Sequence, residues 1–281
     1  GTPVYTLRGV GFYETSIGAY PTVSTYVDEA PLAFPVLSSH SAFDLERVEI
    51  LKGPQGTLFG QNATGGAINY IAAKPTNELS AGGSISYGRF NEVVADAFIS
   101  GPTLSARLAG RIERADGWQI SNSRPGDRNG KVENYMGRLL IDFEPTERLR
   151  FKLNINGWKD NSETQAPQYI ALFPQAPAFL TPQLAAAQFS PQRPQAADWT
   201  PGVPRRSNRL GQATLRTEFD VSDDVTLTSL TSYADYKQRQ GDEGDGLPLS
   251  TLDLVNNTGR IKSFNQELRI SNNSGSDFRW V

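Results

Sequence analysis

Hydrophobic and polar residues alternate over long stretches of the chain from about residue 80 onward. In one such stretch Leu108 and Ile112 share a face of an extended chain, and Arg107 and Arg111 share the opposite face. Successive side chains of a strand point to opposite sides, so this period of two predicts β-strands with one apolar and one polar face. We expect strands at 81–90, 92–101, 103–115, 132–144, 147–160, 208–222, 224–238 and 262–273, with another starting at Asp277.

The connections between these strands alternate in length. Three of the connections are long, namely 116–131, 161–206 and 239–261. The connections that alternate with them are tight turns. Short turns at one end and long loops at the other are typical of an outer-membrane barrel. A soluble β-sandwich also alternates apolar and polar residues, but it has no reason to sort its loops by end. Strands of about 12–15 residues also favour the barrel, because strands of soluble proteins usually have five or six.

One face of the predicted strands is nearly free of charge, and the other face is highly charged. The charged positions are Arg107, Arg111, Glu113, Arg138, Lys152, Arg216, Glu218, Glu267 and Arg269. An Arg or Lys pointing into the middle of a bilayer costs about 2–4 kcal/mol, so we expect these side chains to face the lumen. A soluble barrel with a wet outer face would show the same split with inside and outside exchanged.

Residues 1–79 differ from the rest of the chain in composition and in the length of their apolar runs. They are rich in glycine, and short apolar runs predict strands near Val4–Val10, Thr22–Val27, Val48–Leu51 and Ala67–Ala72. We therefore divide the chain into a small, mostly β or mixed α/β unit over 1–79 and a barrel unit over 80–281. Eight or nine strands cannot close around a unit of this size, so we expect a fragment that lacks much of its barrel.

Composition excludes several other kinds of protein. The net charge is −3, so the chain lacks the basic excess that tracks nucleic-acid phosphates. There is no cysteine and a single histidine, His40, so thiolate nucleophiles and multi-histidine metal sites are excluded. No run approaches the roughly 18 apolar residues of a spanning helix. No signal peptide follows Gly1, so either it was removed or this is an internal piece. We expect no enzyme, no metal and no cofactor.

A motif within the first unit resembles the plug domain of TonB-dependent outer-membrane receptors. It comprises FDLERVEILKGPQGTLFG over 43–60 and NATGGAINYI over 62–71, continuing to Lys74 and Pro75. Upstream, LRGVG over 7–11 and YVD over 26–28 also look like the family, and NQELRI over 265–270 resembles a recurrent barrel segment. The resemblance extends over the whole chain in organisation, and its specific motifs are concentrated in 43–75.

The resemblance implies a mostly β protein with a plug inside an antiparallel transmembrane β-barrel, 22-stranded in the family and incomplete in this chain. It implies an energy-coupled receptor in the outer membrane of a Gram-negative bacterium, embedded in outer-membrane lipid. Such a receptor binds a scarce, bulky solute, such as siderophore-iron, cobalamin or an oligosaccharide, and imports it into the periplasm. The energy would come from the TonB complex through a TonB box that this chain lacks. A passive porin and a soluble carbohydrate-binding module are the alternatives.

In this family, basic plug residues pair with inward barrel glutamates and hold the plug while leaving it movable. By motif position the plug members here would be Arg47 and Lys52, and the barrel members would be Glu218 and Glu267. We therefore predict a charge cluster of these four residues. The alternative is that some of them only face lumen water.

Ligand contacts are expected from the plug apex and the long external loops, because these face the outside. From the plug we select Phe34, Gln61 and Asn62, and from the 161–206 loop we select Tyr169, Phe173 and Trp199. One interpretation is that these aromatic side chains form a rigid apolar surface for a ligand. The alternative is that they pack against other residues of the same loop. His40 is expected to be a solvated plug-loop residue. The acidic segment 241–246 is either a calcium loop or a solvated acidic loop.

Overall fold

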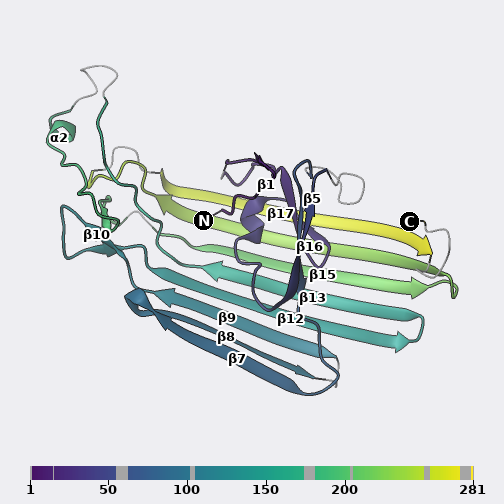
Figure 1. The fold of residues 1–281 in the computed structure, drawn as a ribbon. Coiled ribbons are helices and arrows are strands. Elements are labelled where there is room, and N and C mark those ends of the chain that lie inside the picture. Colours follow the sequence, from purple (N-terminus) through teal and green to yellow (C-terminus); the bar gives the residue numbers. More distant parts are fainter. Residues whose placement is uncertain are drawn as a thin grey trace.

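The computed structural model describes residues 2–14, 16–54, 63–101, 105–173, 181–202, 205–249, 254–272 and 280. Within these residues two large sheets are formed, one of eight strands and one of four (Figure 1). No helix in the described part of the chain is long and apolar enough to cross a membrane.

The larger sheet is antiparallel throughout and follows the chain order. Its spatial order is β17-β16-β15-β13-β12-β9-β8-β7. The strands are β7 (Ser80–Gly88), β8 (Glu92–Gly101), β9 (Ala106–Ala115), β12 (Val132–Thr146), β13 (Leu149–Asp160), β15 (Asn208–Asp220), β16 (Val225–Asp242) and β17 (Leu254–Asn272). All eight fully predicted strands are present, but β16 and β17 are longer than predicted and take up both ends of the expected 239–261 connection, which leaves a shorter loop over 243–253. The strand expected from Asp277 lies outside the described residues.

The predicted separation of the two strand faces is also confirmed. Large apolar side chains project from one face and remain exposed, among them Ile85, Ile99, Leu108, Ile112, Phe143, Ile155, Leu215, Phe219, Phe264, Leu268 and Ile270. The opposite face carries the charged and amide side chains, of which Arg107, Arg138, Asn154 and Gln212 are buried. An apolar band facing outward is the surface that a bilayer requires.

The long connections all lie at one end of the larger sheet (Figure 1), which they share with the short turn η2 (Arg89–Asn91) between β7 and β8. At the end with long connections, two of the loops form a small sheet of β10 (Gln119–Ser121), β11 (Arg128–Asn129) and β14 (Ala196–Ala197). A short helix, α2 (Pro182–Ala185), lies at the same end. These elements were not predicted, because strands of two or three residues leave no periodic pattern.

The smaller sheet has the order β4-β3-β6-β5, in which β3 and β6 are parallel. Its strands are β3 (Val23–Val27), β4 (Ala30–Leu32), β5 (Leu45–Lys52) and β6 (Gly66–Ala72), and the 3-10 helix η1 (Pro35–Ser38) follows β4. The strand predicted over Val4–Val10 is instead a hairpin of β1 (Thr6–Leu7) and β2 (Val10–Gly11). The chain turns there because Arg8 and Gly9 adopt positive φ values of 51° and 80°.

The two units share one hydrophobic core. Val36, Leu37 and Phe43 of the smaller unit pack in the same cluster as Trp158 and Tyr236 of the larger sheet. The smaller unit therefore lies against the polar face of the larger sheet. Its purple elements cross the larger sheet in Figure 1. Much of the face that we expected to line a lumen is thus covered by the smaller unit.

Candidate functional site

The most unusual backbone in the smaller unit lies in the two-residue turn between β3 and β4. Asp28 and Glu29 have positive φ values of 48° and 68°. Tight hairpins require this conformation, but it costs a residue with a side chain about 1–2 kcal/mol, so asparagine and glycine usually occupy such turns. The turn is held by Asn69, whose side-chain oxygen accepts from the Glu29 amide at 3.2 Å. The strained turn directs two carboxylates at the neighbouring sheet.

Both carboxylates of this turn contact the larger sheet. Glu29 Oε2 lies 2.8 Å from Arg216 Nη1 and 3.0 Å from Arg269 Nη1. Asp28 accepts a hydrogen bond from the amide group of Asn154 through one oxygen and from the Ala72 backbone at 2.9 Å through the other. These contacts fasten the β3–β4 turn to strands β13, β15 and β17.

A second, more deeply buried contact lies beside the start of β5. Arg107 Nε donates to Asp44 at 2.9 Å, and both side chains are about nine-tenths buried. Arg138, which is 2% exposed, donates to the backbone oxygen of Phe43 at 2.7 Å and to that of Asp44 at 3.0 Å. The Arg138 guanidinium also lies 4.5 Å from the centre of the Phe43 ring. Because both guanidinium groups are shielded from water, these hydrogen bonds are charge-assisted and strong.

The structure does not form the predicted cluster of Arg47, Lys52, Glu218 and Glu267. Arg47 lies on the exposed side of β5 and pairs with Glu46 and Glu49 of its own unit. Lys52 is exposed and forms no ion pair within the described ranges.

The two barrel glutamates do face the smaller unit, but each is neutralised within the larger sheet. Glu218 pairs with Arg150 and Arg216, and Glu267 pairs with Arg269. The contacts between the units therefore have the opposite polarity, with anions on the smaller unit and cations on the sheet. A conspicuous signal was available in the sequence, namely two adjacent acids at a hairpin turn.

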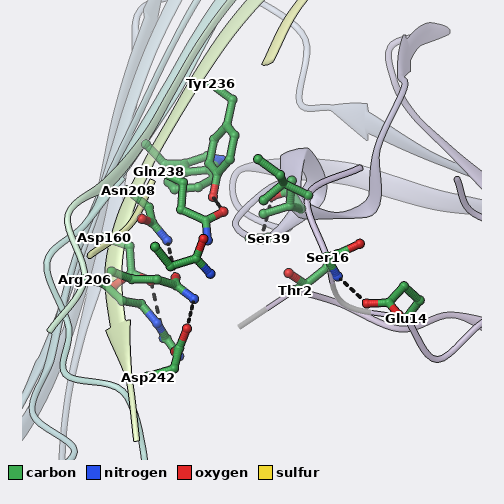
Figure 2. A pocket seen from close by; sticks show the side chains of 15 residues that line it. Thr2, Glu14, Ser16, Ser39, Asp160, Arg206, Asn208, Tyr236, Gln238 and Asp242 are labelled. Carbon is green, nitrogen blue, oxygen red and sulfur yellow. Dashed lines mark hydrogen bonds and ion pairs between the residues drawn. The ribbon is translucent and has the colours of Figure 1, made fainter. Parts of the chain in front are cut away.

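A cavity of about 360 Å³ lies between the two units, toward the end with long loops. Figure 2 shows Asp160, Arg206 and Asp242 on the strand side of this cavity, with Glu14 and Ser39 on the side of the smaller unit. Asn208, Tyr236, Gln238, Gln240 and Asn257 complete much of its polar wall.

His40 lies at the edge of this region and is more enclosed than we predicted. Its ring centre is 4.9 Å from that of Trp158, and its Nε2 atom is 3.8 Å from Asp160 Oδ2, which is too long for a hydrogen bond. The expectation of a solvated loop residue is wrong, because η1 carries His40 into the contact between the two units.

The residues predicted to contact a ligand differ in their exposure and in their packing. Phe34 packs against Tyr20, with ring centres 5.2 Å apart, and Gln61 and Asn62 lie outside the described residues. Tyr169 is 8% exposed and Trp199 is 6% exposed, whereas Phe173 is 87% exposed. Tyr169 packs on Phe189 of the same loop, at 5.2 Å. The structure thus brings Tyr169 and Trp199 into contacts within the loops, and it leaves Phe173 accessible.

Two buried carboxylates tie the loops together. Asp198 accepts from the Ser121 hydroxyl at 2.7 Å and from the Ser123 amide at 3.0 Å. Glu243 accepts from the Thr200 amide at 2.9 Å and from the Gly246 amide at 3.1 Å. In the described part of the acidic segment, no group of three or more acidic or histidine side chains could hold a metal ion. Glu243 instead organises its own loop.

Comparison with known proteins identifies the architecture. A family model of the TonB-dependent receptor plug domain matches residues 1–67, which contain the strained turn and β5. Residues 1–67 therefore match the plug domain of the TonB-dependent receptors. The smaller unit is therefore referred to below as the plug and the larger sheet as the barrel wall. Members of this family are receptors and transporters of the outer membrane rather than enzymes.

Individual relatives agree with this assignment. The pesticin receptor of Yersinia pestis is 29% identical over 153 residues, covering 50% of this chain and 21% of that protein. The ferripyoverdine receptor of Pseudomonas aeruginosa is 30% identical over 146 residues, covering 52% of this chain and 17% of that protein. The chain thus spans about a fifth of the length of these curated relatives.

Solved structures share the fold. The ferric yersiniabactin uptake receptor of Yersinia pestis superimposes with a TM-score of 0.71 at 21% identity, over 96% of this chain and 39% of that one. The ferripyoverdine receptor of Pseudomonas aeruginosa, bound to ferripyoverdine, gives a TM-score of 0.68 at 14% identity, over 95% of this chain and 34% of that one. The arrangement of plug and wall is therefore that of the family.

Proposed function

We propose that this chain is part of an energy-coupled receptor that binds a scarce, bulky solute at the outer membrane and imports it into the periplasm. The observation that carries this proposal is the docked plug. It shares a hydrophobic core with the barrel wall and is fastened to it at Glu29 and Asp44. A wall covered in this way does not suit a passive pore, because solute passage requires the plug to move.

The ion pairs of Glu29 support such a movement. They are partly exposed, and exposed ion pairs exchange readily for water as the plug shifts. We propose that the plug is residues 1–79 and that the barrel begins at residue 80, a division supported by the two separate sheets. The force on the plug would come from the TonB complex.

The solute is proposed to belong to the classes that curated relatives are named for. These relatives include a ferripyoverdine receptor, a catecholate siderophore receptor and a vitamin B12 transporter. An oligosaccharide is a further candidate class. Among the predicted contact residues, Phe173 remains suited to touch a ligand directly, since its side chain is exposed. Phe34, Tyr169 and Trp199 are proposed to shape the binding region from behind.

The experiment is an uptake assay on cells or outer-membrane vesicles that contain the full-length parent protein. Iron chelates, cobalamin and oligosaccharides are supplied with and without an uncoupler of the proton-motive force. We expect uptake of one class, and we expect the uncoupler to abolish it. Uptake that is indifferent to the uncoupler would identify a diffusion channel instead.

A further inference from the structure

The mouth cavity, defined as the cavity lined by Asp160, Arg206, Asn208, Tyr236, Gln240 and Asp242, carries an excess of negative charge. Three carboxylates line it, from Glu14, Asp160 and Asp242, against the single guanidinium of Arg206. That guanidinium lies 3.6 Å from the Asp160 carboxylate. The positive charge is thus already matched within the wall, and the remaining field disfavours an anionic ligand.

The amide groups of the wall form hydrogen bonds within the wall itself. Asn208 Nδ2 donates to Gln240 Oε1 at 3.0 Å, and Gln240 Nε2 donates to Asp242 Oδ2 at 2.8 Å. The oxygen of Gln238 accepts from the Tyr236 hydroxyl at 3.1 Å, and the oxygen of Asn208 accepts from the Arg239 backbone N–H at 3.1 Å. Because both the donors and the oxygens of these amides are used inside the wall, the carboxylates are the main acceptors that remain for a ligand.

One further polar atom of the wall is suited to form a hydrogen bond with a ligand. The indole N–H of Trp158 is buried and has no hydrogen-bond partner in the part of the chain that the structure describes. Trp158 is 7% exposed and lines the mouth cavity. A buried donor without a partner costs about 1–3 kcal/mol, and a ligand acceptor would relieve that cost.

We propose that the mouth cavity binds a portion of the imported solute that carries N–H or O–H donors and no negative charge, such as a protonated amine. A nearby acceptor of the same solute would take the Trp158 N–H. This inference rests on the proposed function and specifies the chemistry that the receptor selects.

The test uses three probes that share one iron centre. They are the ferric complex of a linear trihydroxamate with a terminal ammonium group, its N-acetyl derivative and its N-succinyl derivative. Equilibrium binding is measured on the full-length receptor in outer-membrane vesicles at low and at physiological salt. We expect the ammonium probe to bind about tenfold more tightly than the succinyl probe, with a smaller ratio at higher salt.

Two variants connect this ratio to the mouth cavity. Asp242→Asn removes one carboxylate, and Asn257→Lys adds a cation at an exposed lining position, so both should reduce the ratio to about twofold. Asp223→Asn, in the turn at the opposite end of the wall, is the matched control and should leave the ratio unchanged. Asn257→Lys keeps the test valid if Asp242→Asn fails to assemble.

Three results would overturn the inference. They are equal binding of the three probes, tighter binding of the succinyl probe, and no binding of any probe. The proposed function is judged separately, by uncoupler-sensitive uptake. Energy-dependent import of an anionic ferric catecholate that is unaffected by Asp242→Asn would retain the receptor function and reject the inferred chemistry.

Discussion

The Glu29 carboxylate bridges Arg216 and Arg269, at 2.8 and 3.0 Å, although these arginines lie on strands β15 and β17, which are not neighbours. Strand β16 runs between them. One plug side chain thus spans three strands of the wall from a turn whose backbone is strained. Strain of this kind persists where surrounding contacts hold it, and here the contacts are those that fasten the plug.

Replacing Glu29 should loosen the plug without unfolding the wall. Each ion pair is partly exposed and contributes about 0.2–1 kcal/mol, so Glu29→Gln should cost roughly 1 kcal/mol of plug docking. Limited proteolysis of the plug in the full-length receptor measures this as a several-fold increase in cleavage rate. Glu46→Gln, which breaks a pair inside the plug, is the control and should have little effect. An unchanged rate in Glu29→Gln would show that the bridge does not restrain the plug.

Replacing Arg138 should weaken plug docking more than replacing Glu29, because Arg138 is buried and donates hydrogen bonds to backbone oxygens of the plug. Arg138→Met keeps much of the volume but leaves the Phe43 oxygen without the Arg138 donor, while the Asp44 oxygen keeps only its hydrogen bond from the Ala73 N–H, at a cost of roughly 1–3 kcal/mol. Urea-induced release of the plug, followed by a label at a cysteine introduced into the plug, measures the loss. Arg138→Lys should recover only part of it, since an ammonium group lacks the planar fork of arginine. Full recovery by lysine would argue that charge alone acts here.

The strands of the wall could be predicted from the sequence because successive residues of each strand face two different environments. Lipid requires apolar side chains on one face and the plug requires polar ones on the other, so Leu108 and Arg107 already indicate their directions. The same alternation does not predict which plug residue lies opposite a given charged residue of the wall. For this reason Glu218 and Glu267 were placed on the correct face but assigned the wrong partners.

Short plug elements escaped prediction for a different reason. Strand β4 has three residues with Pro31 at its centre, and proline disfavours a strand because it lacks the N–H donor. It is tolerated because β4 lies at the edge of the plug sheet, where one side of the strand needs no pairing. The inter-unit role of Asp44 could not be predicted either, because it depends on how two distant segments dock.

Tyr70 makes plug stability sensitive to alkaline pH. The Ser38 hydroxyl donates to the Pro35 oxygen at 2.8 Å, so Tyr5 must donate to Ser38 and Tyr70 must donate to Tyr5, each at 3.0 Å. Burial, together with the hydrogen bond to Tyr5, raises the pKa of Tyr70 well above its usual value near 10. The stabilisation is therefore complete below about pH 10 and is lost as the pH rises further.

The variant Tyr70→Phe tests this chain of hydrogen bonds. It should lose about 1 kcal/mol at neutral pH, because one hydrogen bond is removed, and it should lose less additional stability between pH 9 and 11. Urea-induced plug release measured across that range gives both quantities. Identical slopes for wild type and variant would mean that Tyr70 has the same pKa in the docked and the released plug.

Asp198 should control the order of the external loops. Asp198→Ala leaves the hydroxyl of Ser121 and the amide of Ser123 without their acceptor, which costs roughly 1–3 kcal/mol locally. We expect Trp199 to become exposed, observed as a red-shifted fluorescence and faster cleavage of the loop. Asp223→Ala, in the exposed turn at the opposite end of the wall, should change neither signal. Retention of the native emission in Asp198→Ala would show that packing of the aromatics is sufficient.

The outward face of the wall offers the sharpest test of its environment. Leu215 projects from β15 away from the plug and lies opposite Leu153 and Thr231 on the neighbouring strands. If this face contacts lipid, Leu215→Arg should destabilise the full-length protein in vesicles by about 2–4 kcal/mol, while Asp223→Arg in the exposed turn should have no effect. Reversible unfolding in lipid vesicles measures the difference. A water-facing surface would tolerate the arginine at 215 with a change within about 0.5 kcal/mol, so that result would favour a soluble β module over a membrane wall.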